Sequence, residues 1–93
     1  MAEGYENNPN TLLIATEIVA DFNNYKSTGC YKGATSVGTL NLPTTGYWLL
    51  FVIAYSPLTD IAQLAIDINN GYAYCRVFHD NSTWSAWRRL DNV

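Results

Sequence analysis

Residues 47–79, YWLLFVIAYSPLTDIAQLAIDINNGYAYCRVFH, decide the fold. The first part, Tyr47 to Tyr55, is apolar on both alternating faces, which predicts a central strand covered on both sides. It is much shorter than the roughly 18 to 20 apolar residues that cross a bilayer. We therefore expect a strand at the heart of a sheet and no membrane insertion.

Two more strands follow from the same stretch. The chain turns at Pro57, and Ile61 to Ile68 then alternates between apolar and more polar positions, as a half-buried strand does. Asn70-Gly71 predicts a tight hairpin with a type I′ turn, in which both central residues need positive φ. Tyr72 to His79 is therefore expected to pair antiparallel with Ile61 to Ile68.

Residues 84–90, WSAWRRL, follow a polar turn and are expected to form a fifth strand. Earlier in the chain, Cys30 to Lys32 predicts a short strand, and residues 33–46 are rich in Gly, Thr and Pro, as loops are. The fold class is thus mainly all-β, a small antiparallel meander of about four to five strands.

The N-terminal part is expected to differ from this sheet. Residues 1–10 are polar and predict a flexible leader or linker stump, with residues 11–93 forming a single domain. The apolar spacing favours a short helix near Thr16 to Asn23, although β-branched residues in this stretch also suit a strand. The first ten residues lack the basic and apolar regions of a signal peptide.

Charge is scarce in this chain of 93 residues. Charged residues make up 14% of it, against about 25% in an average domain. A net charge of −3 supplies no broad basic field, so nucleic acid is not an expected partner. The low charge over many rings suggests that something else covers part of the surface, such as another copy of the chain.

Few residues point to catalysis, a metal or a cofactor. Cys30 and Cys75 have no neighbouring ligands, so we expect two buried thiols, with a disulfide as the alternative. His79 is the only histidine. Asp60 and Asp80 fit turns, and Asp67 fits the solvent-facing side of a strand, so no carboxylate pair is expected to act on a glycoside. No phosphate-binding loop is present, and no cofactor is expected.

Aromatic residues instead suggest binding. Tyrosine and tryptophan offer a rigid apolar body with one polar group, which suits protein interfaces and sugar faces, and an arginine among rings can stack on them. The same rings also suit a core, above all Trp48 in the central strand. The expected ligand-binding residues are Tyr72, Tyr74, Arg76, Trp84, Trp87 and Arg88.

One ordered set of residues resembles the pyocin-knob-like domain of phage and R-type pyocin tail fibres. Its most specific part is the ending, Trp84-Ser85-x-Trp87-Arg88-x-Leu90. The earlier residues of the set are Asp21-Phe22-Asn23, Thr28-Gly29, Tyr31, Leu42-Pro43, Gly46, Gln63, Tyr74 and Arg76.

This resemblance implies a non-enzymatic β module near the distal end of a homotrimeric fibre, with a bacterial cell-surface glycan or protein as receptor. It implies a virion tail-fibre location, with assembly in the bacterial cytoplasm, release by lysis and reduced cysteines. The alternative is a carbohydrate-binding module of a surface or secreted protein, with Tyr72, Tyr74, Trp84 and Trp87 as a sugar platform. The fibre hypothesis predicts a trimer, whereas the alternative predicts a monomer with exposed rings.

Overall fold

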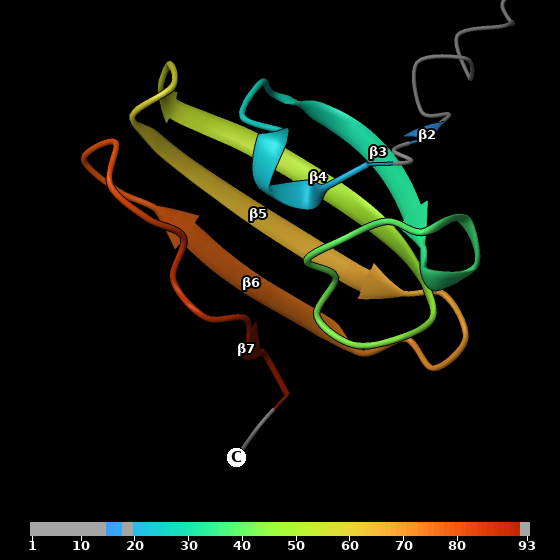
Figure 1. The fold of residues 1–93 in the computed structure, drawn as a ribbon. Helices are drawn as coiled ribbons and strands as arrows, with labels where there is room; N and C mark the ends of the chain where they lie inside the picture. The colour runs from blue at the N-terminus through green and yellow to red at the C-terminus, as the bar shows by residue number, and fades with distance from the viewer. Residues whose placement is uncertain (1–14, 18–19, 92–93) are drawn as a thin grey trace, which may run out of the picture.

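The computed structural model describes residues 15–17 and 20–91 and shows one twisted sheet (Figure 1). Six strands follow each other across the sheet in chain order, from β2 to β7. They are β2 (Thr16–Glu17), β3 (Gly29–Ala34), β4 (Tyr47–Ser56), β5 (Asp60–Asp67), β6 (Ala73–Phe78) and β7 (Arg88–Arg89). Strands β3 to β7 pair antiparallel with their neighbours, which confirms the predicted meander.

The predicted N-terminal helix is wrong. Thr16–Glu17 is instead a strand that pairs in parallel with β3, so the sheet is mixed and has one strand more than expected. Phe22–Asn24 forms only a single 3-10 turn, η2, because the side chain of Asp21 accepts the Asn23 amide and holds the chain in a local cap. The predicted leader, residues 1–10, lies outside the described residues.

A second 3-10 turn, η3 (Thr35–Val37), follows β3 and begins the loop to β4. No helix in residues 15–17 and 20–91 is long and apolar enough to cross a membrane.

One face of the sheet carries the core. The η2 turn and the loop before β4 lie across this face in Figure 1. The buried apolar residues are Phe22, Ala34, Trp48, Leu50, Val52, Ile61, Ala65 and Phe78. Trp48 is therefore structural, as its place in the central strand predicts, and its indole N–H donates to the carbonyl oxygen of Thr44 at 2.9 Å.

Polar residues of β5 face this core. Gln63 and Asp67 are 1% and 5% exposed, so the prediction that Asp67 faces solvent is wrong. Asp67 remains buried at the end of β5 because its carboxylate accepts hydrogen bonds from the amides of Asn69 and Asn70 and from the Asn70 side chain. Alternation along the strand was predicted correctly, but the polar side of the strand points inward.

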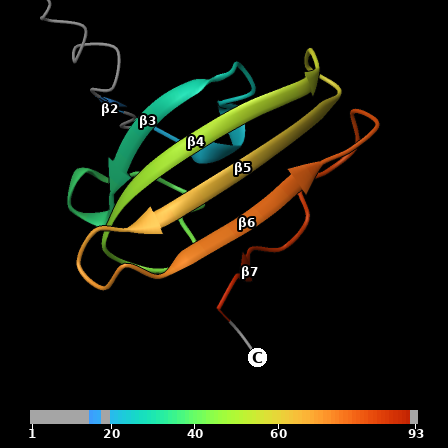
Figure 2. The ribbon, with the colours of Figure 1, turned by 180° about the vertical axis from the view of Figure 1, so that it is seen from behind.

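No described segment crosses the other face of the sheet, which Figure 2 shows from behind. The predicted cover on the second side of β4 is therefore not supplied by residues 15–17 and 20–91, and Ile53 and Tyr55 are 63% and 90% exposed there. Three cross-strand rows make this face apolar from β4 to β6. They are Leu49–Ile66–Ala73, Phe51–Leu64–Cys75 and Ile53–Ala62–Val77. We call these nine residues the open face.

The hairpin between β5 and β6 is confirmed, but its turn is wider than predicted. Gly71 has φ 77°, whereas Asn70 is not among the residues with positive φ, so the turn is not type I′. The amide of Gly71 donates to the carbonyl of Asp67 at 2.7 Å, and the Asp67 side chain holds the two intervening asparagines. A type I′ turn needs two residues with positive φ, whereas this turn has Gly71 alone and is held by the Asp67 carboxylate.

Both cysteines are free thiols, as predicted, but they are half-buried rather than buried. Cys30 on β3 is paired with Phe51, and Cys75 on β6 is paired with Leu64. Two strands therefore lie between them, which separates the α-carbons by about 14 Å. A disulfide needs about 7 Å or less.

The C-terminal segment is less regular than the predicted fifth strand. Only Arg88–Arg89 forms a strand with β6, whereas Trp84 makes a single bridge to Phe78. Arg89 reaches an acidic partner, Asp91, as expected for one member of the arginine pair, and its guanidinium lies 3.7 Å from the ring of Tyr72.

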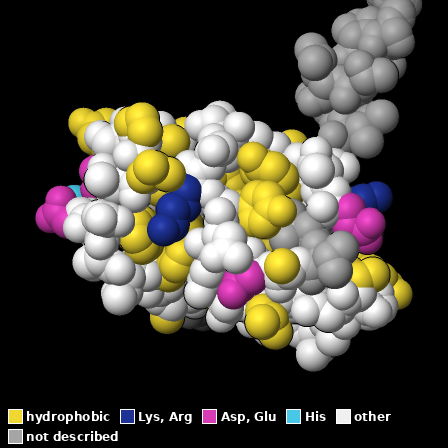
Figure 3. Space-filling model, turned by 45° about the horizontal axis from the view of Figure 1, so that its top comes forward, with side chains coloured by type: hydrophobic (Ala, Val, Ile, Leu, Met, Phe, Trp, Pro, Cys, Tyr) yellow, Lys and Arg dark blue, Asp and Glu magenta, His cyan; other side chains and the backbone are white. Residues whose placement is uncertain are grey.

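Figure 3 shows the molecule tilted from the view of Figure 1 so that its top comes forward. The surface in this view is mostly hydrophobic or uncharged. Charged side chains appear there in small separate groups, in keeping with the 14% charged residues of the chain.

Candidate functional site

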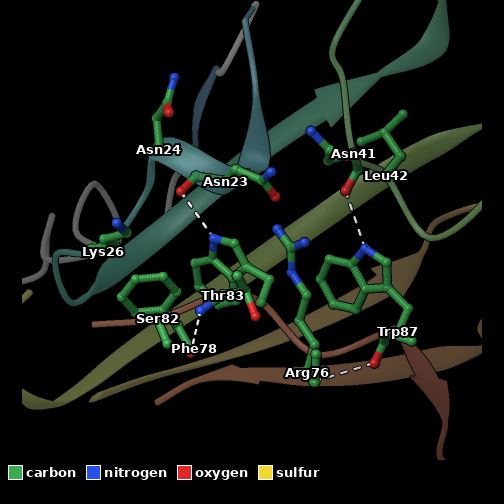
Figure 4. Close-up of a pocket in the computed structure, with 13 residues that line it drawn as sticks. Asn23, Asn24, Lys26, Asn41, Leu42, Arg76, Phe78, Ser82, Thr83 and Trp87 are labelled. Carbon is green, nitrogen blue, oxygen red and sulfur yellow. Dashed lines mark hydrogen bonds between the residues drawn. The ribbon is translucent and has the colours of Figure 1, made fainter. Parts of the chain in front are cut away.

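A pocket of about 640 Å³ opens on the covered side of the sheet. It lies between η2, the loop at residues 41–42, strand β6 and residues 82–87 (Figure 4). Its lining combines three asparagines, three hydroxyl-bearing residues, three aromatic rings and two cations. No carboxylate lines it among the described residues. Its volume is typical of a site for a small ligand.

Arg76 of β6 lies within this pocket and is 5% exposed. Its Nε donates to Gln63 Oε1 at 2.8 Å on the adjacent strand. The amide nitrogen of Gln63 in turn donates to the carbonyl oxygens of Phe22 and Tyr25, at 2.8 and 3.0 Å. The network therefore ties the η2 turn to the sheet and fixes the orientation of the guanidinium.

Trp84 and Trp87 enclose the same guanidinium. The ring centroids lie 4.2 and 4.3 Å from Arg76 Cζ, at distances typical of cation–π contacts. Their indole N–H groups donate to the carbonyl oxygens of Asn23 and Asn41, both at 3.1 Å. In a regular strand these two tryptophans would face opposite sides, whereas the irregular segment lets both pack against the core.

The charge of Arg76 has no acidic partner in direct contact within residues 15–17 and 20–91. Burial lowers its pKa to about 10, against the opposing attraction of Asp21. Among the described residues no carboxylate forms an ion pair with it. The second cation of the pocket, Lys26, lies 4.0 Å above the ring of Phe78. The two indoles and Gln63 therefore stabilise a charge that burial disfavours.

Two buried atoms of residues that line the pocket have no hydrogen-bond partner among the described residues. They are Nη2 of Arg76, a donor, and Oδ1 of Asn23, an acceptor. Buried polar atoms in proteins are nearly always paired, so two unpaired atoms are unusual. Each of them exposes less than 1 Å² of surface, so both lie beneath the wall of the pocket. In Figure 4 the amide of Asn23 and the guanidinium of Arg76 point toward each other.

The structure brings together half of the residues predicted to bind a ligand. Arg76, Trp84 and Trp87 share the pocket, whereas Tyr72, Tyr74 and Arg88 are not among its lining residues. Tyr74 packs edge-on against Trp48 at 5.4 Å, and Tyr72 lies under Arg89. Arg88 is exposed on β7 opposite Cys75.

Sequence reasoning missed the polar rim of the pocket, including Asn23, Asn41 and Thr83. Asn23 is one of the residues that resemble the pyocin-knob-like domain, and this was the only indication in the sequence that it has a role. Asn41 reaches the pocket through a left-handed backbone, with φ 61°, and a side-chain hydrogen bond to Asp21 at 2.8 Å. Such loop geometry depends on contacts 20 residues apart in sequence.

A second polar cluster lies at the start of β5. Nδ1 of His79 and Oδ1 of Asp60 are 2.6 Å apart, and the same oxygen accepts the Asp80 amide at 3.1 Å. Ligand atoms of these three residues lie within 4.8 Å of one another. Their hydrogen bonds join the turn after β6 to the start of β5, so the cluster has a structural role.

The fold is similar to that of an N-truncated R2-type pyocin tail fibre. The TM-score is 0.72 at 25% sequence identity, and the match covers 85% of this chain. It covers 33% of that chain, so this chain spans about a third of the length of the fibre chain it matches. No protein-family model and no curated protein sequence matches significantly. The resemblance to a pyocin tail-fibre domain is therefore confirmed by structure.

Proposed function

We propose that this chain, a domain similar to part of a pyocin tail fibre, is a non-enzymatic module of a phage or phage-like tail fibre that contacts the bacterial surface. The observation that carries the proposal is the likeness over 85% of the chain at TM-score 0.72. It supports a place in the tail of a virion-like particle. Assembly in the bacterial cytoplasm and release by lysis belong to the same proposal.

The pocket around Arg76 is the proposed contact for the receptor. It offers a cation, two indoles and several amide and hydroxyl groups in one concave surface. Aromatic rings beside polar groups that converge on one concave surface are a feature of ligand sites. A bacterial cell-surface glycan or a surface protein side chain is the partner that this proposal names.

Binding to cells tests the proposal directly. Fluorescently labelled chain is added to a panel of bacterial strains, and the cell-bound fraction is measured after washing. Thr83→Trp places a large side chain at the exposed rim of the pocket and is expected to reduce binding at least tenfold. Thr45→Trp makes the same change at an exposed position away from the pocket and serves as the matched control.

Saturable binding to some strains, lost with Thr83→Trp and retained with Thr45→Trp, is the expected result. If neither the original chain nor either variant binds to any strain, the receptor-contacting role is contradicted. Equal binding by all three proteins places the receptor contact elsewhere on the chain. Unchanged thermal unfolding of both variants is required for either conclusion.

The open face is the proposed contact between copies of the chain, which we propose to be a homotrimer in the fibre. Ile53 and Val77 on this face are 63% and 50% exposed, and no charged residue occupies its three rows between β4 and β6. Exposed apolar patches of this kind mark association surfaces. Closed rotational symmetry is the usual way in which identical chains cover such patches.

A further inference from the structure

The turn between β5 and β6 contains Asn70-Gly71, the only Asn-Gly pair in the chain. Asparagine is one of the chemically labile residues of proteins. It is most labile before glycine, because a residue without a side chain leaves its own backbone nitrogen unobstructed and its backbone free to turn. Both residues are exposed, so water can reach them. The pair is therefore a candidate for spontaneous deamidation.

Deamidation proceeds in two steps, with water as the second reactant. The Gly71 nitrogen gives up its proton and forms a bond to Asn70 Cγ, while the bond from Cγ to Nδ2 breaks and the side-chain nitrogen leaves with that proton as ammonia. Water then opens the resulting five-membered imide at one of its two carbonyl groups, which yields aspartate or isoaspartate. The first step needs a free Gly71 nitrogen and a side-chain amide that can turn toward it.

Hydrogen bonds to Asp67 oppose both requirements in the folded turn. The Gly71 amide donates to the backbone carbonyl oxygen of Asp67 at 2.7 Å, and a carbonyl is too weak a base to remove this proton. The Asn70 side-chain nitrogen donates to Oδ2 of Asp67 at 3.0 Å. This bond holds the side-chain amide that the Gly71 nitrogen would have to attack.

Asp67 is itself held in place by further contacts. The residue is 5% exposed. Its carboxylate also accepts the backbone amides of Asn69 and Asn70, at 2.9 and 3.3 Å. Its own amide donates to the Tyr72 carbonyl oxygen at 2.8 Å, across the hairpin. The groups that restrain Asn70 and Gly71 therefore move away only when this end of the hairpin opens.

We propose that Asn70 is a deamidation site whose reaction is restrained by Asp67 while the hairpin is closed. The inference goes beyond the proposed function, because it concerns the chemical lifetime of the domain and needs neither a receptor nor a second copy.

Deamidation at this site would prevent the turn from closing again in the same way. The product carries a carboxylate in place of the nitrogen that lies 3.0 Å from the buried carboxylate of Asp67. A hydrogen bond is thereby replaced by repulsion between like charges. Isoaspartate also lengthens the backbone of the turn by one carbon. The reaction therefore weakens the hairpin irreversibly.

Peptide mapping by mass spectrometry provides the test. The original chain is kept in mildly alkaline buffer for several weeks, folded or unfolded in urea, and aspartate and isoaspartate at position 70 are quantified. We expect the reaction to be at least tenfold slower in the folded chain. Hydrogen exchange of the Gly71 amide measures the opening of one of the two restraining bonds. Deamidation should be slowed at least as much as this exchange, because it requires both bonds to open.

Asp67→Asn keeps the size of the side chain but removes the acceptor that holds the Asn70 amide. It is expected to speed the reaction at Asn70 at least fivefold in the folded chain. Asn81, which is exposed in another turn and followed by serine, is the internal control and should react at the same rate in both proteins.

Asn70→Asp reproduces one product directly. It should lower Tm more than Asn69→Asp, the matched control in the same turn, because Asn69 bonds to Asp67 through its backbone amide. Equal loss of Tm in the two variants would contradict the repulsion described above.

Three results would overturn the inference. They are equal rates at Asn70 in the folded and unfolded chains, an unchanged rate in folded Asp67→Asn, and deamidation that is slowed less than exchange of the Gly71 amide. If Asp67→Asn does not fold, the comparison of deamidation with exchange in the original chain decides.

Discussion

Gln63 shows how a single residue organises both the core and the pocket. The residue is 1% exposed and uses its whole side-chain amide, donating to two carbonyls of the η2 region and accepting from Arg76. A polar residue at such a depth is tolerated only when its hydrogen bonds are complete. The arginine between the two tryptophans therefore depends on it.

Replacing Gln63 with methionine keeps the shape of the side chain and removes every one of these hydrogen bonds. The buried Phe22 carbonyl keeps only its bond from the Tyr25 amide, and the part-buried Tyr25 carbonyl and the buried guanidinium N–H lose their bonds to Gln63. The free energy of unfolding should therefore fall by about 2–4 kcal/mol. Urea denaturation measures this loss. Lys32→Met, at an exposed position of β3, is the control and should change stability by about 0.5 kcal/mol or less. Equal stability of the two variants would contradict the role assigned to Gln63.

Gly33 is the other residue whose identity the packing requires. A Cβ atom built there would lie 2.7 Å from a ring carbon of Phe22 and 2.9 Å from Cγ2 of Thr39. Phe22 thus packs directly on the backbone of β3. A side chain at position 33 would prevent this contact.

Gly33→Ala should destabilise the fold by about 1–3 kcal/mol through overpacking. Thermal unfolding of Gly33→Ala, Phe22→Leu and the double variant measures the coupling between the two positions. The cost of the added methyl should shrink when the ring is replaced by leucine, because the clash is with the ring. Strictly additive effects would rule out this contact as the reason for glycine.

At the scale of elements, β5 begins and ends with an aspartate that holds a turn. Hydrogen bonds from the Asp80 amide and from His79 lower the pKa of Asp60 below its ordinary value of 3.8. At the other end, hydrogen bonds from the Asn70 side chain and from the amides of Asn69 and Asn70 lower the pKa of Asp67, against the effect of burial. Both turns therefore depend on ionised carboxylates.

Acid should loosen both ends of β5. The folded pKa of each group is lower than its unfolded value, so the stabilisation is fully present above pH of about 4 and is lost as pH falls through the folded pKa. Thermal unfolding between pH 6 and 2.5 should show a drop in Tm below pH of about 4. Asp60→Asn with Asp67→Asn should make this drop shallower, whereas an unchanged slope would show that other carboxylates account for it.

At the scale of the whole molecule, the sheet has one face packed on its own chain and one open face. A sheet of this kind leaves apolar side chains such as Ile53 and Val77 exposed within one chain. Charge is also too scarce to keep the open side well hydrated, with 14% charged residues. The proposed association of copies would account for both features.

Light scattering tests this association. We expect the mass of a trimer for the original chain, and a mass close to one chain for Ile53→Lys combined with Val77→Lys, because six charges would have to be desolvated together. Leu40→Lys, at a position 61% exposed in the loop before β4, is the control and should leave the trimer intact. A monomer at every concentration of the original chain would contradict this use of the open face.

Much of this architecture could be predicted because it depends on local pattern. Alternation and turn residues identified the strands from β3 to β6 and their antiparallel order. The aromatic content, with an arginine among the rings, indicated Arg76, Trp84 and Trp87, which do meet in one pocket. Local rules failed at the N-terminus, where pairing with Tyr31 and Lys32 of β3 outweighed the helical spacing at Thr16–Glu17. They also missed Asn23 and Asn41, whose roles come from contacts distant in the chain.

By itself the sequence determined which residues of each strand share a face, because successive side chains of any strand point to opposite sides. Only the tertiary structure decided which face points inward. Leu64 and Ile66 of β5 lie on the open face, while Gln63 and Asp67 lie inside. The physical reason is that the direction of a strand's faces depends on what packs against them. Here η2 and the C-terminal tryptophans supply the partners that a buried glutamine and arginine require.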